Sequence, residues 1–237
     1  MKKIKLFEEF LNEKDENYDG WANSTDKEII AVIKRNGIIS YEGMLSTGYE
    51  PSDAVKAGCL KIDPQILQHI ENPSEELQLI AVSQDSFKKY KGGYGNREDF
   101  ENAIRWIENP SEKVQMAAVE TSGEAIKFIK NPSEKVQMAA VKNYNGALEW
   151  IVDPSERVQI ASVEQSHPIK ADLSIQHISD PSEKVQIASV NAYSGSIQYI
   201  QNPTPKVQMI ACKDYPGNIK YIKVPAPEVA KEFSSLK

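Results

Sequence analysis

Cysteine, histidine and long apolar runs are scarce in this chain of 237 residues, and each scarcity excludes a class of protein. The two cysteines, Cys59 and Cys212, lie far apart with no partner at metal-ligand spacing, so neither a zinc site nor a disulfide framework is predicted. No segment approaches the ~18 consecutive apolar residues of a membrane span, and the N-terminus does not read as a secretory signal. We therefore expect a reduced, intracellular protein located in the cytoplasm.

Residue patterns that carry catalysis are also missing. The histidines, His69, His167 and His177, have no serine, cysteine or carboxylate partner at motif spacing. No Lys-Ser/Thr pair follows the glycines near Gly92, so a nucleotide-binding loop is not supported. The net charge of −6 argues against a general phosphate-binding surface, because nucleic-acid binders usually present a basic face. The sequence predicts a protein that is not an enzyme and that uses no cofactor.

The chain does contain an internal repeat, which is the strongest signal in its text. The segment from Pro110 to Val119 reads Pro-Ser-Glu-Lys-Val-Gln-Met-Ala-Ala-Val, and near copies begin at Pro132, Pro154, Pro181 and Pro203. Weaker copies begin at Pro51, Pro73 and Pro225, and a degenerate one near Asn23. Most intervals are 22 residues, but the interval after Pro73 is 37 and the interval after Pro154 is 27. We expect these copies to form an array of about seven to eight two-helix repeats.

Each unit reads as two helices. The first is expected to open with Asn or Asp as the N-cap, followed by Pro at the first helical position, with Glu closing a capping box. The second is about two turns long, with apolar residues three apart, as in Ile126 and Ile129. Helices this short are marginal alone, so neighbouring units must bury each other. We expect an all-α protein, an α-solenoid over residues 23–237 with an insertion loop at 83–100, preceded at 1–22 by an amphipathic helix and an acidic linker.

The repeated block resembles the leucine-rich repeat variant and HEAT-like classes of short α-solenoid. The stretch from Asp26 to Gly37, Asp-Lys-Glu-Ile-Ile-Ala-Val-Ile-Lys-Arg-Asn-Gly, resembles a bacterial and viral family of helical repeats of unknown function. Together these resemblances cover roughly residues 24–232. They imply a helical-repeat fold that offers an interaction surface, and they imply no particular activity.

Stacked repeats would align equivalent residues into columns. One column is aromatic or histidine and holds His69, Trp106, Phe128, Trp150, His177, Tyr199 and Tyr221. These rings either pack between successive units or line a groove suited to a peptide or to stacked bases. A second column holds Gln78, Gln115, Gln137, Gln159, Gln186 and Gln208, which we expect to hydrogen-bond backbone or one another; a ligand-reading row is the alternative. The Glu and Lys columns are expected to be caps and a solvated face.

The longest break in the repeat, at 83–100, is basic, aromatic and rich in glycine. Its candidate binding residues are Lys88, Lys89, Tyr90, Lys91, Tyr94 and Arg97. Such a loop could clamp a phosphate, a nucleic acid strand or an acidic partner. The alternative is a solvated connector between two repeats.

The N-terminal segment carries two further patterns. The text Phe-Glu-Glu-Phe-Leu-Asn-Glu from Phe7 resembles the head-targeting peptides of contractile-tailed phages, and that resemblance implies cleavage after Glu13. The alternative is an amphipathic helix that caps the first repeat.

Residues 15–26 follow the spacing of a calcium-binding EF-hand loop. The candidate oxygen ligands are Asp15, Asn17, Asp19 and Asp26. Position twelve is Asp rather than Glu and no partner hand exists, so an acidic linker is the alternative.

These observations favour a non-catalytic protein-interaction scaffold, encoded by a phage and associated with the virion or with takeover of the host. The alternative is a nucleic-acid-binding repeat protein that uses the basic loop at 87–97 and the aromatic column.

Overall fold

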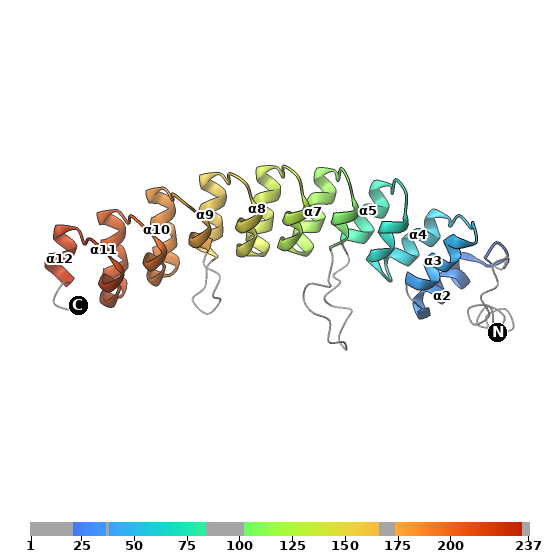
Figure 1. Cartoon of the computed structure of the whole chain (residues 1–237), viewed down its shortest axis with the longest axis horizontal. Helices are drawn as coiled ribbons and strands as arrows, with labels where there is room; N and C mark the ends of the chain where they lie inside the picture. The colour runs from blue at the N-terminus through green and yellow to red at the C-terminus, as the bar shows by residue number, and fades with distance from the viewer. Residues whose placement is uncertain (1–20, 37, 84–101, 166–173, 234–237) are drawn as a thin grey trace. The chain divides into compact units, whose positions relative to one another are not determined.

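The computed structural model describes residues 21–36, 38–83, 102–165 and 174–233, and over these residues the chain is helical with no strand. This confirms the predicted all-α class for the described part of the chain. The chain divides into two compact units, Met1–Ala118 and Val119–Lys237, whose described α-helices are labelled in Figure 1. Among the described helices, none combines the length and apolar character needed to cross a bilayer.

Over its described residues, the N-terminal unit starts with three α-helices and continues as α-helices alternating with 3-10 helices. Its elements are α2 (Asp26–Asn36), α3 (Ile38–Ser46), α4 (Asp53–Leu60), η1 (Pro64–His69), α5 (Glu75–Val82) and η3 (Ala103–Trp106), with α7 (Glu112–Thr121) at its end. Helix α2 packs against α3 and α4, α4 packs against η1 and α5, and η1 packs against η3. The two 3-10 helices are therefore neighbours although residues 84–101 separate their repeats.

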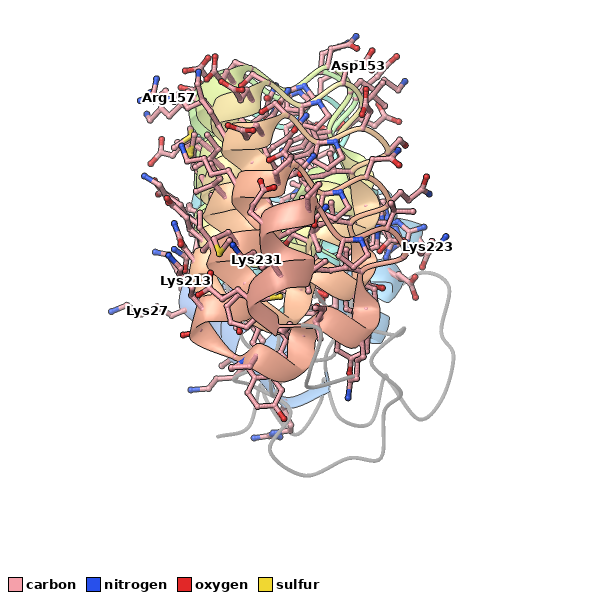
Figure 2. The ribbon with its side chains drawn as sticks, turned by 90° about the vertical axis from the view of Figure 1, so that its left-hand side faces the viewer. Lys27, Asp153, Arg157, Lys213, Lys223 and Lys231 are labelled. Atoms are coloured by element: carbon pink, nitrogen blue, oxygen red, sulfur yellow. The ribbon has the colours of Figure 1, made fainter. Side chains whose placement is uncertain are left out.

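The C-terminal unit alternates 3-10 and α-helices without exception over its described residues. The order is η4 (Gly123–Phe128), α8 (Glu134–Asn143), η5 (Asn145–Trp150), α9 (Glu156–Glu164), η6 (Ser174–His177), α10 (Glu183–Ala192), η7 (Ser194–Tyr199), α11 (Pro205–Asp214), η8 (Pro216–Tyr221) and α12 (Pro227–Phe233). From α8 to α12 each α-helix packs on the next, and from η4 to η8 each 3-10 helix packs on the next. The unit therefore has two layers, and Figure 2 shows Arg157 and Lys213 on the α side and Lys223 on the other.

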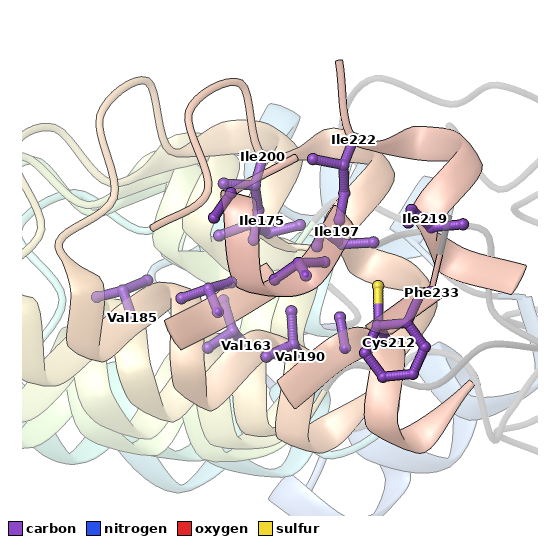
Figure 3. Packing of buried hydrophobic residues seen from close by; sticks show 14 residues of the cluster. Val163, Ile175, Val185, Val190, Ile197, Ile200, Cys212, Ile219, Ile222 and Phe233 are labelled. Carbon is purple, nitrogen blue, oxygen red and sulfur yellow. The ribbon is translucent and has the colours of Figure 1, made fainter. Parts of the chain in front are cut away.

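The core of the C-terminal unit lies between these two layers. The α layer contributes the valine at the third helical position, such as Val185, and residues five further on, such as Val190. The 3-10 layer contributes residues three apart, such as Ile197 and Ile200, which meet them (Figure 3). Six residues at three per turn make two turns, so the predicted two-turn second helix is present as a 3-10 helix. The three-residue period explains why residues three apart face the same way.

The predicted N-caps are wrong. In seven repeats a serine or threonine directly after the proline caps the first helix by accepting a hydrogen bond from the backbone N–H three residues ahead, at 3.2–3.4 Å. The caps are Ser52, Ser74, Ser111, Ser133, Ser155, Ser182 and Thr204. The expected capping box is instead found once at α2, where Thr25 and Glu28 exchange hydrogen bonds.

At three of the six Asn or Asp positions the physical reason is backbone conformation. Asn72, Asn131 and Asp153 have positive φ values of 47°, 51° and 48°, whereas an N-cap residue needs an extended backbone. Asn and Asp tolerate this left-handed region better than other non-glycine residues. These residues therefore turn the chain, and the helix starts two residues later than the sequence pattern predicts.

Acidic residues at the first helical position link one repeat to the next. The Ser111 hydroxyl donates to Glu75 at 2.5 Å, and Lys113 lies 3.7 Å from the same carboxylate. In the C-terminal unit, Ser182 donates to Glu156 at 2.6 Å and Lys184 to Glu156 at 3.1 Å. Both links span a long interval of the repeat, so the insertions leave the packing register unchanged.

The same link involves Asp26, which the calcium hypothesis treats as a ligand. Its carboxylate accepts a hydrogen bond from the Ser52 hydroxyl at 3.2 Å. Asp26 therefore occupies the place that Glu75 and Glu156 hold in later repeats, which supports a repeat unit at the start of α2.

We expect Ser133→Ala to destabilise the protein by about 1 kcal/mol, because it removes the N-cap of α8. Ser133→Thr should retain most of the stability. The measurement is urea unfolding followed by circular dichroism. If Asn131 were the cap, Ser133 would be an ordinary first-turn residue and alanine there would leave stability unchanged or raise it.

The hydrogen bond from Ser182, then the bond and charge of Lys184, lower the pKa of Glu156. A carboxyl whose pKa is lower in the folded state stabilises that state above its unfolded pKa, and the contribution disappears as pH falls through the folded value. Carbon-13 NMR titration should show the Glu156 midpoint below its ordinary range, and Ser182→Ala should raise it. Ser133→Ala removes an equivalent cap elsewhere and should leave the midpoint unchanged; equal shifts in both variants would contradict the assignment.

Candidate functional site

The most distinctive surface of the C-terminal unit is a row of rings at the ends of its 3-10 helices. We define the ring row as Phe128, Trp150, His177, Tyr199 and Tyr221, the last residues of η4 to η8. In a helix of three residues per turn, the residue just before an inward-facing one is rotated about 120° from the core. Each ring therefore stands at the edge of the 3-10 layer.

The rings are not buried between repeats. Tyr199 is 42% exposed and Tyr221 is 41% exposed, while Phe128 and Trp150 are half-buried and His177 is exposed. A ring whose only role is packing loses most of its contact with water, because burial is what makes an aromatic side chain stabilising. The exposure of His177, Tyr199 and Tyr221 favours the groove interpretation at these positions, whereas Phe128 and Trp150 keep less contact with water.

Lysines lie over the rings at both ends of the row. The Lys127 ammonium is 5.0 Å from the Phe128 ring centroid and 5.7 Å from the Trp150 centroid, so one cation contacts the rings of two repeats. Lys220 lies 4.8 Å from the Tyr221 centroid. These distances are within the range of cation–π attraction. Each of these lysines directly precedes its ring in the sequence, but no pattern in the sequence predicts the contact.

A pocket of about 260 Å³ opens beside Tyr199, between the connections that follow η6 and η7. The lining residues with amide, hydroxyl or carboxylate side chains are Gln176, Ser179, Asp180, Gln186, Gln201 and Asn202. Most of these residues are exposed. The pocket can therefore offer hydrogen-bond donors and acceptors to a ligand that also contacts the Tyr199 ring.

The glutamine column is structural. The side-chain amides of Gln78, Gln115, Gln137, Gln159, Gln186 and Gln208 donate to the carbonyl of the proline five residues earlier, at 2.8–3.0 Å. The oxygen of Gln208 also accepts from the Ala226 N–H at 2.8 Å, and that of Gln186 from the Thr204 N–H at 3.3 Å. Their amides therefore serve the backbone of their own and the next repeat, as expected, rather than a ligand-reading row.

In the N-terminal unit, the predicted column members lie in different surroundings. Trp106 ends η3, is half-buried and lies 5.9 Å from the Arg105 guanidinium. The His69 ring nitrogen is 3.3 Å from a Glu42 carboxylate oxygen. Trp106 remains a binding candidate there, and the ring row is defined for the C-terminal unit alone.

The remaining predicted site residues lie outside the described residues. They are Lys88, Lys89, Tyr90, Lys91, Tyr94 and Arg97 of the insertion loop, Asp15, Asn17 and Asp19 of the calcium hypothesis, and Glu13 of the cleavage hypothesis. Loop binding, calcium binding and cleavage therefore remain predictions.

Both cysteine thiols are fully buried. Burial raises the pKa of Cys59 to about 12 and also raises the pKa of Cys212. A reactive cysteine needs the opposite environment, exposed and electropositive, because the thiolate is the nucleophile. The two thiols therefore act as small apolar core residues.

Replacing Gln208 tests the structural role of its column. Gln208→Ala should destabilise the protein by about 2–3 kcal/mol, because it leaves the buried Ala226 N–H and the Pro203 carbonyl without their partner. Gln159→Ala, at a half-buried position, should cost less. Denaturant unfolding measures both. If the Gln208→Ala protein were as stable as the wild type, the structural role would be wrong and the glutamine column would be better explained as a row that binds a ligand.

Known proteins give no guide to the role of the ring row, so its role is inferred from its geometry alone. No protein-family model, curated protein or solved structure matches the chain.

Proposed function

We propose that the chain is an α-solenoid of 22-residue repeats and that it acts as a non-catalytic protein-interaction scaffold. The repeated text and the ordered packing of helical pairs within each unit support the solenoid. The phage resemblance near Phe7 extends the proposal to a protein of the virion or of host takeover.

The single observation that carries the binding role is the exposure of the ring row. Aromatic side chains that keep 41–42% of their surface exposed offer apolar area and a polar tip at the same point. Such residues are the usual anchors of protein interfaces. Because every 3-10 helix of the C-terminal unit supplies one ring, a partner can make repeated contacts along the row.

The charges beside the row favour a protein partner over a nucleic acid. The exposed carboxylates Glu149, Asp153 and Asp180 lie in or directly after η5 and η6, in the middle of the row. A strand whose bases stacked on these rings would bring its phosphates near the acids, where like charges repel. We therefore place a polypeptide on the row.

A random peptide library displayed on particles tests the proposal, with selection on the immobilised full chain. Peptides should enrich on the wild type and fail to bind a triple variant with Trp150→Ala, Tyr199→Ala and Tyr221→Ala, because the variant lacks the anchors. Tyr215→Ala is the matched control, since Tyr215 is 59% exposed and lies off the row.

Circular dichroism first establishes that the variants remain folded. Failure of any peptide to enrich would contradict the proposal. Ring-dependent binding of a single-stranded oligonucleotide in its place would favour the nucleic-acid function.

A further inference from the structure

The spacing of the ring row limits the conformation of the segment that can lie along it. Helices that pack side by side are about 8–10 Å apart, and the 3-10 helices pack in chain order with one ring each. The position of Lys127 gives an independent limit. Its distances of 5.0 Å to Phe128 and 5.7 Å to Trp150 place these two ring centroids no more than 10.7 Å apart, the sum of the two.

A polyproline II helix has a matching period. With three residues per turn and a rise of about 3.1 Å, it presents the same face every ~9.3 Å. A β-strand returns to the same face every ~6.7 Å and would lose register with the rings within two repeats. An α-helix presents the same face at every second turn, about 10.8 Å, as its nearest match to the ring spacing. Its carbonyl oxygens are already hydrogen-bonded within the helix, so they could not accept bonds from the groups beside the rings.

The hydrogen-bonding groups beside the rings also fit this conformation. A polyproline II chain has no internal hydrogen bonds, so its carbonyl oxygens need donors from the surface on which it lies. The pocket beside Tyr199 is lined by Gln176, Gln201 and Asn202, residues whose side chains carry amide donors. The ring and the amides together offer one apolar contact and one set of donors for a turn of the ligand, the pattern by which aromatic grooves recognise proline-rich chains.

The charges along the row change sign in an order that a ligand can complement. Exposed Lys127 and Lys130 lie at η4, where they outnumber the exposed Glu124, whose carboxylate is 3.9 Å from the Lys127 ammonium, and exposed Lys220 and Lys223 lie at η8. Between them the exposed ions are the carboxylates of Glu149, Asp153 and Asp180, whereas η7 and its connection carry only amides such as Gln201. A complementary ligand is acidic at both ends and basic in the middle.

We infer that the partner of the ring row is a proline-rich segment in the polyproline II conformation, with proline at every third residue, acidic ends and a basic centre. This inference rests on the proposed function and specifies its ligand. Each proline lies against one ring, and the intervening residues direct carbonyls and charges toward the connections between repeats.

A synthetic peptide tests the inference. The probe is a fluorescein-labelled peptide of about fifteen residues, one turn for each ring, with proline at every third position, two aspartates at each end and two lysines at the centre. Two control peptides have the same composition: one has irregular proline spacing, and the other exchanges the positions of the aspartates and lysines. Fluorescence anisotropy with the full chain gives each Kd.

The probe should bind more tightly than both controls. Trp150→Ala, Tyr199→Ala and Tyr221→Ala should each raise its Kd at least about fivefold, as expected for interface anchors, while Tyr215→Ala should change it less than twofold. Tyr199→Phe keeps the ring and should retain most of the affinity. Equal binding of the irregularly spaced peptide, or no binding of any of the three, would overturn the inference.

The displayed library separates the two proposals. Enriched peptides with proline at intervals of three support both. Enriched, ring-dependent peptides without that period would overturn the polyproline inference and leave the scaffold function standing. A library from which nothing enriches would remove the scaffold function as well.

Discussion

The structure depends on burial that no single repeat can achieve. An α-helix of about ten residues is marginal in water, and a six-residue 3-10 helix is weaker still. Each pair of one α-helix and one 3-10 helix leaves one side of residues such as Val185 and Ile197 exposed to water until the next pair packs on it. In the assembled unit both residues are at most 1% exposed. Stability therefore resides in the junctions between pairs rather than within them, which is the energetic character of repeat proteins.

The junctions also have to satisfy backbone polar groups, because every turn between helices exposes some of them. Three recurring residues divide this task. Serine caps the α-helix, glutamine binds the proline carbonyl behind it, and the first acidic residue accepts a hydrogen bond from the serine of the next repeat, as at Glu156 and Ser182. Because these bonds close the junction locally, extra residues can be inserted elsewhere in the repeat without loss of register. This explains how the 27- and 37-residue intervals coexist with the shorter ones.

The buried core residues of the repeats could be predicted from the sequence, whereas the helix caps and the exposure of the rings could not. Burial of Ile197 and Ile200 follows from their spacing alone, since any short helix with that spacing buries them together. The position of the cap did not follow, because Asn131 and Ser133 are both favoured N-caps and only the φ of 51° at Asn131 decides between them. The exposure of Tyr199 also depends on the helix type. A ring next to an inward residue lies elsewhere on an α-helix than on a 3-10 helix.

The two layers of the C-terminal unit differ in how their exposed residues vary between repeats. In the α layer the second helical position is a cation in Lys135, Arg157, Lys184 and Lys206 alike. In the 3-10 layer the residue before the ring is in turn Lys127, Glu149, Gln176, Gln198 and Lys220, while the ring position stays aromatic or histidine. Solvation alone would not keep an apolar ring at an exposed position while its neighbour changes sign. A ligand that runs along the row accounts for both, because constant rings supply affinity at each step and changing charges set its register.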